Sequence, residues 1–231
     1  MRIRHLALIS TAALLAACSA ASESAKSEAS KAKDTASAAV TKTAGAVLKG
    51  DVMKGADLSE LPSGTYKSEQ GHAYVAFQYV HQGYSRPIIR WGTTNATIVF
   101  DADNPENSTL TVSLPVNDID TGVPKWDEHI KAEGFFDAAN HPEITFVSTD
   151  VNQIKDGYGT LTGDLTIKGV TRPFTLTGTI NKVGKHFRSG VDMFGVSATG
   201  QLKRSDFGVD KYSPSSEEID IMIEVEFQKA E

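Results

Sequence analysis

The sequence predicts an all-β fold: an eight-stranded antiparallel barrel with a short helical insert, preceded by a signal peptide and a flexible tether. After residue 60, apolar and polar residues alternate with a period of two in eight segments, which indicates strands with one buried face. The segment 127–146, DEHIKAEGFFDAANHPEITF, interrupts this alternation. The first 60 residues do not show it, so the barrel domain is expected to span residues 61–231.

Residues 1–18, MRIRHLALISTAALLAAC, are typical of a secretory signal peptide. Arg2 and Arg4 precede the apolar run Leu6–Ala17, which is too short to remain as a membrane-spanning helix. The end of this run, Leu-Ala-Ala-Cys, resembles a bacterial lipobox, in which the leader is cut just before a lipid-carrying cysteine. We therefore expect a lipoprotein with acyl chains such as palmitate on Cys18; the alternative is an ordinary signal peptide with a cysteine near its cleavage site.

Cys18 is the only cysteine, so the exported domain has no internal disulfide and depends on its core for stability. Ser19 follows it, where an aspartate would favour retention in the inner membrane. By this resemblance to sorted lipoproteins, we expect a location in the bacterial periplasm, anchored to the outer membrane through Cys18.

Residues 19–60 contain no aromatic side chain, and their six lysines balance six acidic residues. Such a segment has little to bury and is predicted to be a flexible tether or a loose helix. The remaining residues, 61–231, carry 15 Lys and Arg against 23 Asp and Glu, a net charge near −8. A nucleic-acid-binding domain would have a basic face, so we expect no nucleic-acid partner.

The alternation is clearest in residues 218–228, where five apolar residues face one way. The other predicted strands cover residues 72–81, 95–100, 109–114, 144–150, 158–168, 174–183 and 191–203. We interpret Lys168–Pro173 as a hairpin connection. Closing eight strands into a barrel removes exposed sheet edges and leaves room inside for side chains or one small ligand. A β-sandwich would produce a similar alternation and is the alternative fold. Glycines within the strands are suggestive of unfilled lumen volume.

The sequence lacks the common motifs of catalytic and metal-binding sites. The five histidines of the domain have no HxH or HExxH spacing, and the sequence has no GxSxG motif. Asp127-Glu128-His129 groups two acids with a histidine, but adjacent helical residues point in different directions. We expect Asp127 instead to satisfy free amides near the start of a short helix. The sequence therefore predicts no enzyme, no metal site and no cofactor.

Aromatic residues occur in nearly every predicted element, and most are expected to form the core. Phe135 and Phe136 are adjacent, and in a strand they would face opposite sides. Our hypothesis is that one points into the barrel while the other closes its mouth as a lid.

Several blocks, in order, resemble the YceI-like family of lipocalin-like, polyisoprenoid-binding periplasmic proteins. They are HAYVAF (72–77), NDIDTG (117–122), DEHI (127–130), GFFD (134–137), HPEITF (141–146), LTGDLTIKGVTRP (161–173) and RSDFG (204–208). Ala73, Asn117 and Trp126 depart from the family pattern. The blocks cover nearly all of residues 64–228.

This resemblance implies an extended lipocalin-like barrel whose apolar tunnel binds, sequesters or carries an isoprenoid-type lipid, either a polyprenyl lipid or a quinone, without catalysis. The expected ligand-binding residues are Val75, Phe77, Phe146, Leu165, Ile167, Phe174, Phe194, Val196, Ile221 and Ile223 along the tunnel, with Trp91, Phe135 and Phe136 nearer its entrance. The alternatives are a structural or stress-response envelope module with a packed lumen, and an isoprenoid-modifying enzyme. The expected partners are the lipid, the membrane and a homodimeric copy.

Overall fold

The computed structural model describes residues 55–155 and 157–231, so the predicted signal peptide, Cys18 and most of the tether lie outside the described residues. The described chain forms one mainly antiparallel sheet with a single short α-helix. The strands are β1 (Gly64–Tyr79), β2 (Ile88–Trp91), β3 (Asn95–Phe100), β4 (Thr109–Pro115), β5 (Ile119–Asp120), β6 (Glu143–Lys155), β7 (Tyr158–Ile167), β8 (Val170–Lys185), β9 (Asp192–Lys203) and β10 (Glu218–Lys229). The helices are η1 (Leu58–Glu60), η2 (Pro105–Asn107), η3 (Val116–Asp118), α2 (Pro124–Lys131) and η4 (Arg204–Phe207).

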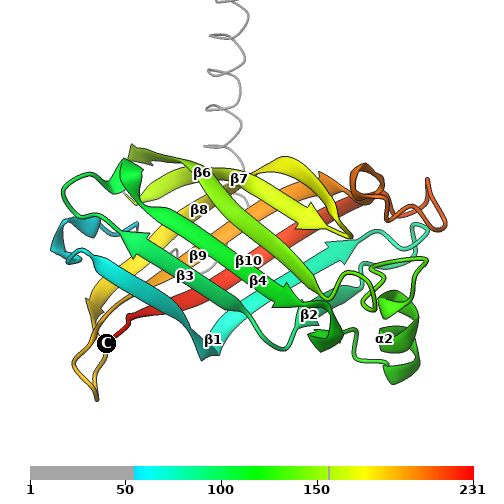
Figure 1. Cartoon of the computed structure of the whole chain (residues 1–231), viewed down its shortest axis with the longest axis horizontal. Coiled ribbons are helices and arrows are strands. Elements are labelled where there is room, and N and C mark those ends of the chain that lie inside the picture. Colours follow the sequence, from blue (N-terminus) through cyan, green and yellow to red (C-terminus); the bar gives the residue numbers. More distant parts are fainter. Residues whose placement is uncertain (1–54, 156) are drawn as a thin grey trace, which may run out of the picture. The chain divides into compact units, whose positions relative to one another are not determined.

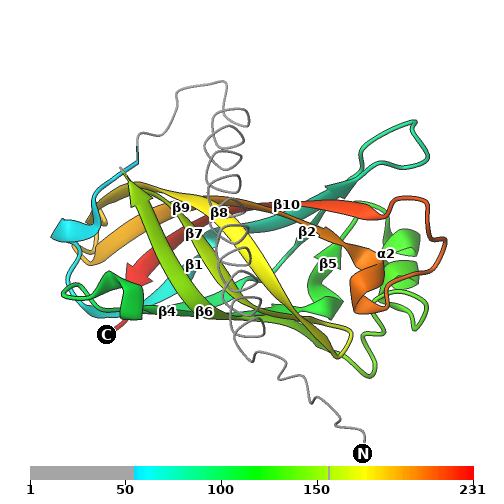
Figure 2. The same cartoon turned by 90° about the horizontal axis from the view of Figure 1, so that it is seen from above.

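Eight of these strands close into a barrel, as predicted. The order is β10-β9-β8-β7-β6-β4-β3-β1, and the ring closes where β1 pairs with β10. The strands cross the long axis of the barrel obliquely, and α2 lies at the same end as the orange segment that contains η4 (Figures 1 and 2). The C-terminus lies at the opposite end. Closure leaves no free edge in the ring, so the ring offers no unpaired strand to another chain.

Strand β1 starts at Gly64, eight residues before the predicted strand beginning at His72. A bulge between Ser68 and Ala73 shifts its register against β10, so the buried residues change from even to odd numbers along the strand. The alternation read in the sequence therefore covers only the second half of β1. The first half pairs with β3, and the second half pairs with β2, which itself pairs with β5. The two short strands β2 and β5 were not predicted.

The predicted connection Lys168–Pro173 is shorter than expected. Ile167 pairs with Val170, so the turn consists of Lys168 and Gly169, whose φ angles are +50° and +75°. Two consecutive positive φ values are characteristic of a two-residue type I′ hairpin. Pro173 lies inside β8, in the part that pairs with β7 but not yet with β9, where a missing N–H is tolerated.

The interruption of the alternation contains α2, which begins at Pro124 rather than near Asp127. Asp127 accepts hydrogen bonds from the backbone N–H of Thr121 at 2.7 Å and from its hydroxyl at 2.6 Å, and these bonds lower the pKa of the Asp127 carboxyl. Asp127 thus satisfies an amide of the turn before the helix, not of the helix itself. No helix in the described ranges is long and apolar enough to cross a membrane.

Residues 55–60, which the composition assigns to the tether, contact the barrel. The N–H of Ala56 donates to the carbonyl of Ile180 at 2.7 Å, and Gly55 and Ala56 lie directly against Gly157. The contacts with the barrel therefore begin a few residues before the predicted boundary at residue 61.

Tyr66 is the largest fully buried side chain, in a core cluster at the end of the barrel away from α2. Its hydroxyl donates to the carbonyl of Pro62 at 2.7 Å, and its ring lies 5.4 Å from that of Phe194. Burial, together with the negative charge of Asp192, raises the pKa of Tyr66 to about 12. The neutral phenol is thus part of the folded state.

We expect this phenol to make the domain sensitive to alkali. An unfolded tyrosine loses its proton near pH 10 and the folded one near pH 12, so the stabilisation is complete below pH 10 and declines as pH rises, by roughly 2 kcal/mol at pH 12. Urea unfolding between pH 9 and 12 should show this decline in the natural protein. In Tyr66→Phe the loss of unfolding free energy between pH 9 and 12 should be smaller by roughly 2 kcal/mol. An equally steep loss in the variant would show that Tyr66 does not cause the sensitivity to alkali.

Candidate ligand-binding site

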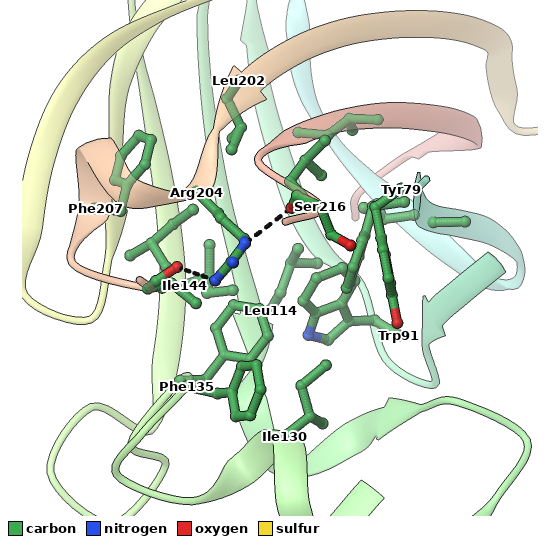
Figure 3. Close-up of a pocket in the computed structure, with 18 of the residues that line it drawn as sticks. Tyr79, Trp91, Leu114, Ile130, Phe135, Ile144, Leu202, Arg204, Phe207 and Ser216 are labelled. Carbon is green, nitrogen blue, oxygen red and sulfur yellow. Dashed lines mark hydrogen bonds between the residues drawn. The ribbon is translucent and has the colours of Figure 1, made fainter. Parts of the chain in front are cut away.

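A cavity of about 480 Å³ lies inside the barrel and opens at the end where α2 and η4 are found. Its walls come from strands far apart in the sequence, and Figure 3 shows Leu114, Ile144 and Trp91 converging on one space from β4, β6 and β2. Three quarters of the lining residues, 24 of 32, are aliphatic or carry a Phe, Tyr or Trp ring. A volume of this size lies within the usual range of small-ligand sites, about 300–1,000 Å³.

Eleven of the thirteen expected ligand-binding residues line this cavity. They are Val75, Phe77, Trp91, Phe135, Phe136, Phe146, Leu165, Ile167, Phe174, Ile221 and Ile223. The other two, Phe194 and Val196, line a second cavity of about 220 Å³ toward the opposite end. Val75, Val112, Leu176 and Ile223 line both cavities, so this layer of side chains separates the two spaces.

Gly163 and Gly200, in the strands of the cavity wall, do not leave the lumen empty as we expected. A Cβ on Gly163 would lie 2.5 Å from Cζ of Phe146, and a Cβ on Gly200 would lie 2.4 Å from Cζ of Phe174. The phenyl rings occupy the room that these glycines leave. The glycines therefore make room for large side chains next to the wall instead of enlarging the lumen.

Phe135 and Phe136 both line the cavity, so the premise that these two residues alternate as in a strand does not hold. They belong to a series of turns and not to a strand: the N–H of Phe135 donates to Ala132, and that of Phe136 donates to Ile130. Strand alternation does not apply in such a segment. Phe136 packs edge-on to Phe77 at 6.5 Å, and Phe135 lies at the mouth, 6.0 Å from the ring of Tyr212.

Arg204, the first residue of η4, is the main polar group of the lining. Its Nε donates to the carbonyl of Ser216 at 2.8 Å, Nη1 to Val209 at 2.6 Å and Nη2 to Ser215 at 2.8 Å; Figure 3 shows it extended between these chain segments. Three carbonyls of the loop between η4 and β10 are thus held by one side chain. Two of its five N–H groups remain free of these bonds.

Two other polar groups of the lining, the indole of Trp91 and the ammonium of Lys211, can only donate hydrogen bonds. Trp91 is 8% exposed, and its indole N–H has no hydrogen-bond partner among the described residues; Figure 3 places that nitrogen on the side of Phe135. The ammonium of Lys211 lies 5.4 Å from the ring centres of Phe135 and Tyr212. No aspartate or glutamate of the described chain lines the cavity. A ligand head that offers oxygen acceptors would match this lining.

Tyr79 lies near Arg204 at the mouth. Burial raises the pKa of the Tyr79 phenol, and the positive charge of Arg204 opposes part of that rise. The phenol therefore stays neutral near neutral pH and is available as a donor or acceptor. Alternation places Tyr79 on the inner face with Val75 and Phe77, but it was not included among the expected site residues.

Sequence reasoning also missed Arg204, Lys211 and Ser216. Arg204 opens the RSDFG block, so the resemblance contained a signal for it. Lys211 and Ser216 lie in an irregular loop without periodicity, and only the path of the chain brings them to the cavity.

The site offers binding groups but no arrangement of acid, base and nucleophile in the described residues. Asp127 is engaged by Thr121, Glu128 is exposed, and the ring of His129 packs 4.9 Å from Trp126. Within residues 55–155 and 157–231, no group of three or more His, Cys, Asp or Glu could hold a metal ion. The chemistry that the geometry supports is the burial of an apolar ligand with a polar end at the mouth.

Fold and site together define a class of protein: a closed antiparallel barrel with an internal apolar cavity that opens at one end. The model of the YceI-like domain matches residues 66–227. The chain belongs to the YceI-like domain family.

Relatives agree with this assignment. A UPF0312 protein of Pseudomonas savastanoi pv. phaseolicola is 33% identical over 185 residues, which cover 80% of this chain and 96% of the relative. The crystal structure of BcnA from Burkholderia cenocepacia has a TM-score of 0.62 at 21% identity, covering 69% of this chain and 98% of BcnA. A polyisoprenoid binding domain from Saccharophagus degradans has a TM-score of 0.56 at 10% identity, covering 71% and 98%. At these identities the two structures establish a common fold.

Proposed function

We propose that this protein binds an isoprenoid-type lipid, a polyprenyl lipid or a quinone, in the lumen of its barrel and sequesters or carries it without catalysis. The observation that carries the proposal is the apolar cavity of about 480 Å³ with its donors near the open end. A lipid tail leaving water for this cavity would be stabilised by roughly 25 cal/mol per Å² of buried apolar area. The polyisoprenoid binding domain with the same fold supports the choice of ligand.

The polar groups suggest an orientation for the ligand. Arg204 and Lys211 are at the open end, and the free indole N–H of Trp91 adds a third donor. The oxygen-bearing head of the lipid would therefore lie near the mouth, and its tail would point toward the layer at Val75 and Ile223. The cavity also favours this function over the alternative of an envelope module whose lumen is filled by its own side chains.

The test uses residues 19–231, because all strand pairs and both cavities lie within residues 55–231. The purified protein is extracted with organic solvent, and the extract is analysed by mass spectrometry. We expect a co-purifying isoprenoid lipid, and saturable binding of an added quinone to delipidated protein. If repeated preparations contain no lipid and the quinone does not bind, the proposal is wrong.

We further propose that the protein is a lipoprotein of the periplasm, anchored to the outer membrane through Cys18. The lipobox-like end of the leader and Ser19 support this location. Changing Cys18→Ser should move the exported protein from the membrane fraction to the soluble fraction and remove palmitate labelling, because acyl chains would supply the attachment. Unchanged fractionation of the variant would exclude the anchor.

A further inference from the structure

The hairpin that joins β1 and β2 has an unusual surface. Val80, Tyr84 and Ile88 are exposed large apolar residues, with exposed fractions of 86% for Tyr84 and 62% for Ile88. Large side chains of this kind cost free energy in water and commonly mark a surface that meets a partner. The hairpin projects from the barrel at the end where α2 and the η4 segment lie (Figure 2).

The hairpin is positively charged in a negatively charged domain. Residues 80–90 contain Arg86, Arg90 and His81 but no acidic residue, whereas residues 61–231 have 15 basic against 23 acidic residues. Arg90 is paired with Asp120 at 2.9 Å. Arg86 makes no salt bridge to the described residues and is exposed. A basic group beside apolar side chains fits an anionic lipid surface.

The base of the hairpin is part of the cavity mouth. His81 and Gln82 line the cavity, and the hydroxyl of Ser216 donates to the carbonyl of Val80 at 2.8 Å. Backbone bonds between His81 and Ser85 and between Tyr84 and His81 hold the tip in a defined turn. Tyr212, which also lines the cavity, is 64% exposed and lies beside Lys211. The exposed apolar and basic groups thus border the opening through which a ligand would pass.

We propose that the β1–β2 hairpin docks on an anionic lipid bilayer, with Tyr84 and Ile88 entering the headgroup region and Arg86 contacting lipid phosphate. Docking would bring the open end of the cavity to the membrane. Docking on a membrane is a property beyond the binding of a lipid in the lumen. Only its purpose, the uptake or delivery of that lipid, rests on the proposed function.

The test is co-sedimentation of residues 19–231, without any lipid anchor, with vesicles of phosphatidylcholine containing phosphatidylglycerol. We expect Tyr84→Ser/Ile88→Ser to weaken binding about tenfold or more, because two apolar side chains no longer enter the bilayer. Arg86→Gln should weaken it about fivefold, and pure phosphatidylcholine vesicles should bind the natural protein less tightly.

The matched control is Phe187→Ser. Phe187 is 87% exposed, lies beside Arg188 on the β8–β9 hairpin and lines neither cavity. It should leave vesicle binding unchanged. Absence of vesicle binding, equal binding to both vesicle types, or an equal loss in Phe187→Ser would overturn the proposal. Hairpin-dependent dimers in sedimentation without vesicle binding would assign the surface to a second copy and would also overturn it.

Quinone binding in solution separates this proposal from the lumenal function. The hairpin variants should retain it, because the substituted side chains of Tyr84, Arg86 and Ile88 do not line the cavity. Vesicle binding without any quinone binding would refute the lumenal function and leave the docking surface supported. Quinone binding without vesicle binding would support the lumenal function and refute the docking surface.

Discussion

Arg204→Met is expected to lower the free energy of unfolding by about 3 kcal/mol. The substitution removes the donors of three carbonyl groups, those of Val209, Ser215 and Ser216, and leaves two of them, those of Val209 and Ser216, partly buried without a partner. The loop between η4 and β10 should loosen as well, because these bonds hold its two halves together. Urea unfolding measures the stability, and amide hydrogen exchange of residues 209–216 reports the loop.

The matched control is Arg90→Met. Arg90 has the same side chain and a carboxylate partner, Asp120, but its side chain is 64% exposed. Exposed ion pairs contribute about 0–1 kcal/mol, so this variant should remain close to the natural protein. Arg204→Lys should recover only part of the loss, because an ammonium cannot reach three carbonyls in the planar geometry of a guanidinium. Equal effects of Arg204→Met and Arg90→Met would show that the carbonyl bonds are not important.

Ile221→Trp is expected to reduce quinone binding by about a hundredfold or more while leaving the barrel folded. Ile221 is only half-buried and lines the larger cavity, so the indole has room inside and takes the place of the ligand tail. Losing the burial of some 100–150 Å² of tail at about 25 cal/mol per Å² corresponds to this change. Calorimetric titration with quinone measures the affinity, and circular dichroism checks the fold.

Val99→Trp is the control for this substitution. Val99 lies in β3 with 53% exposure and does not line either cavity, so the added ring should stay in solvent and binding should be unchanged. If Ile221→Trp fails to fold, Leu202→Phe makes a smaller change in the same lining. Full quinone affinity in a folded cavity-filling variant would place the ligand elsewhere.

The expected lining was accessible to sequence reasoning because alternation determines which side of a strand faces inward. Phe146, Leu165 and Ile167 were predicted in this way, and all three line the cavity. The first half of β1 could not be predicted in this way. The bulge after Ser68 shifts the buried residues from even to odd numbers, which interrupts the alternation. Strand alternation does not describe Phe135 and Phe136 for a related reason: turns follow no period, so the direction of these side chains depends on local backbone bonds.

The sequence by itself determined the class of fold, the inward faces of the strands and the membership of the YceI-like family, because each of these depends on local periodicity or on blocks of sequence that resemble the family in order. Only the tertiary structure decided how the mouth of the cavity is built. Arg204 lies far along the chain from Trp91 and the β1–β2 hairpin, and the hydrogen bond from Ser216 to Val80 spans 136 residues. No local pattern encodes such a contact, since it arises when β10 closes the barrel against β1.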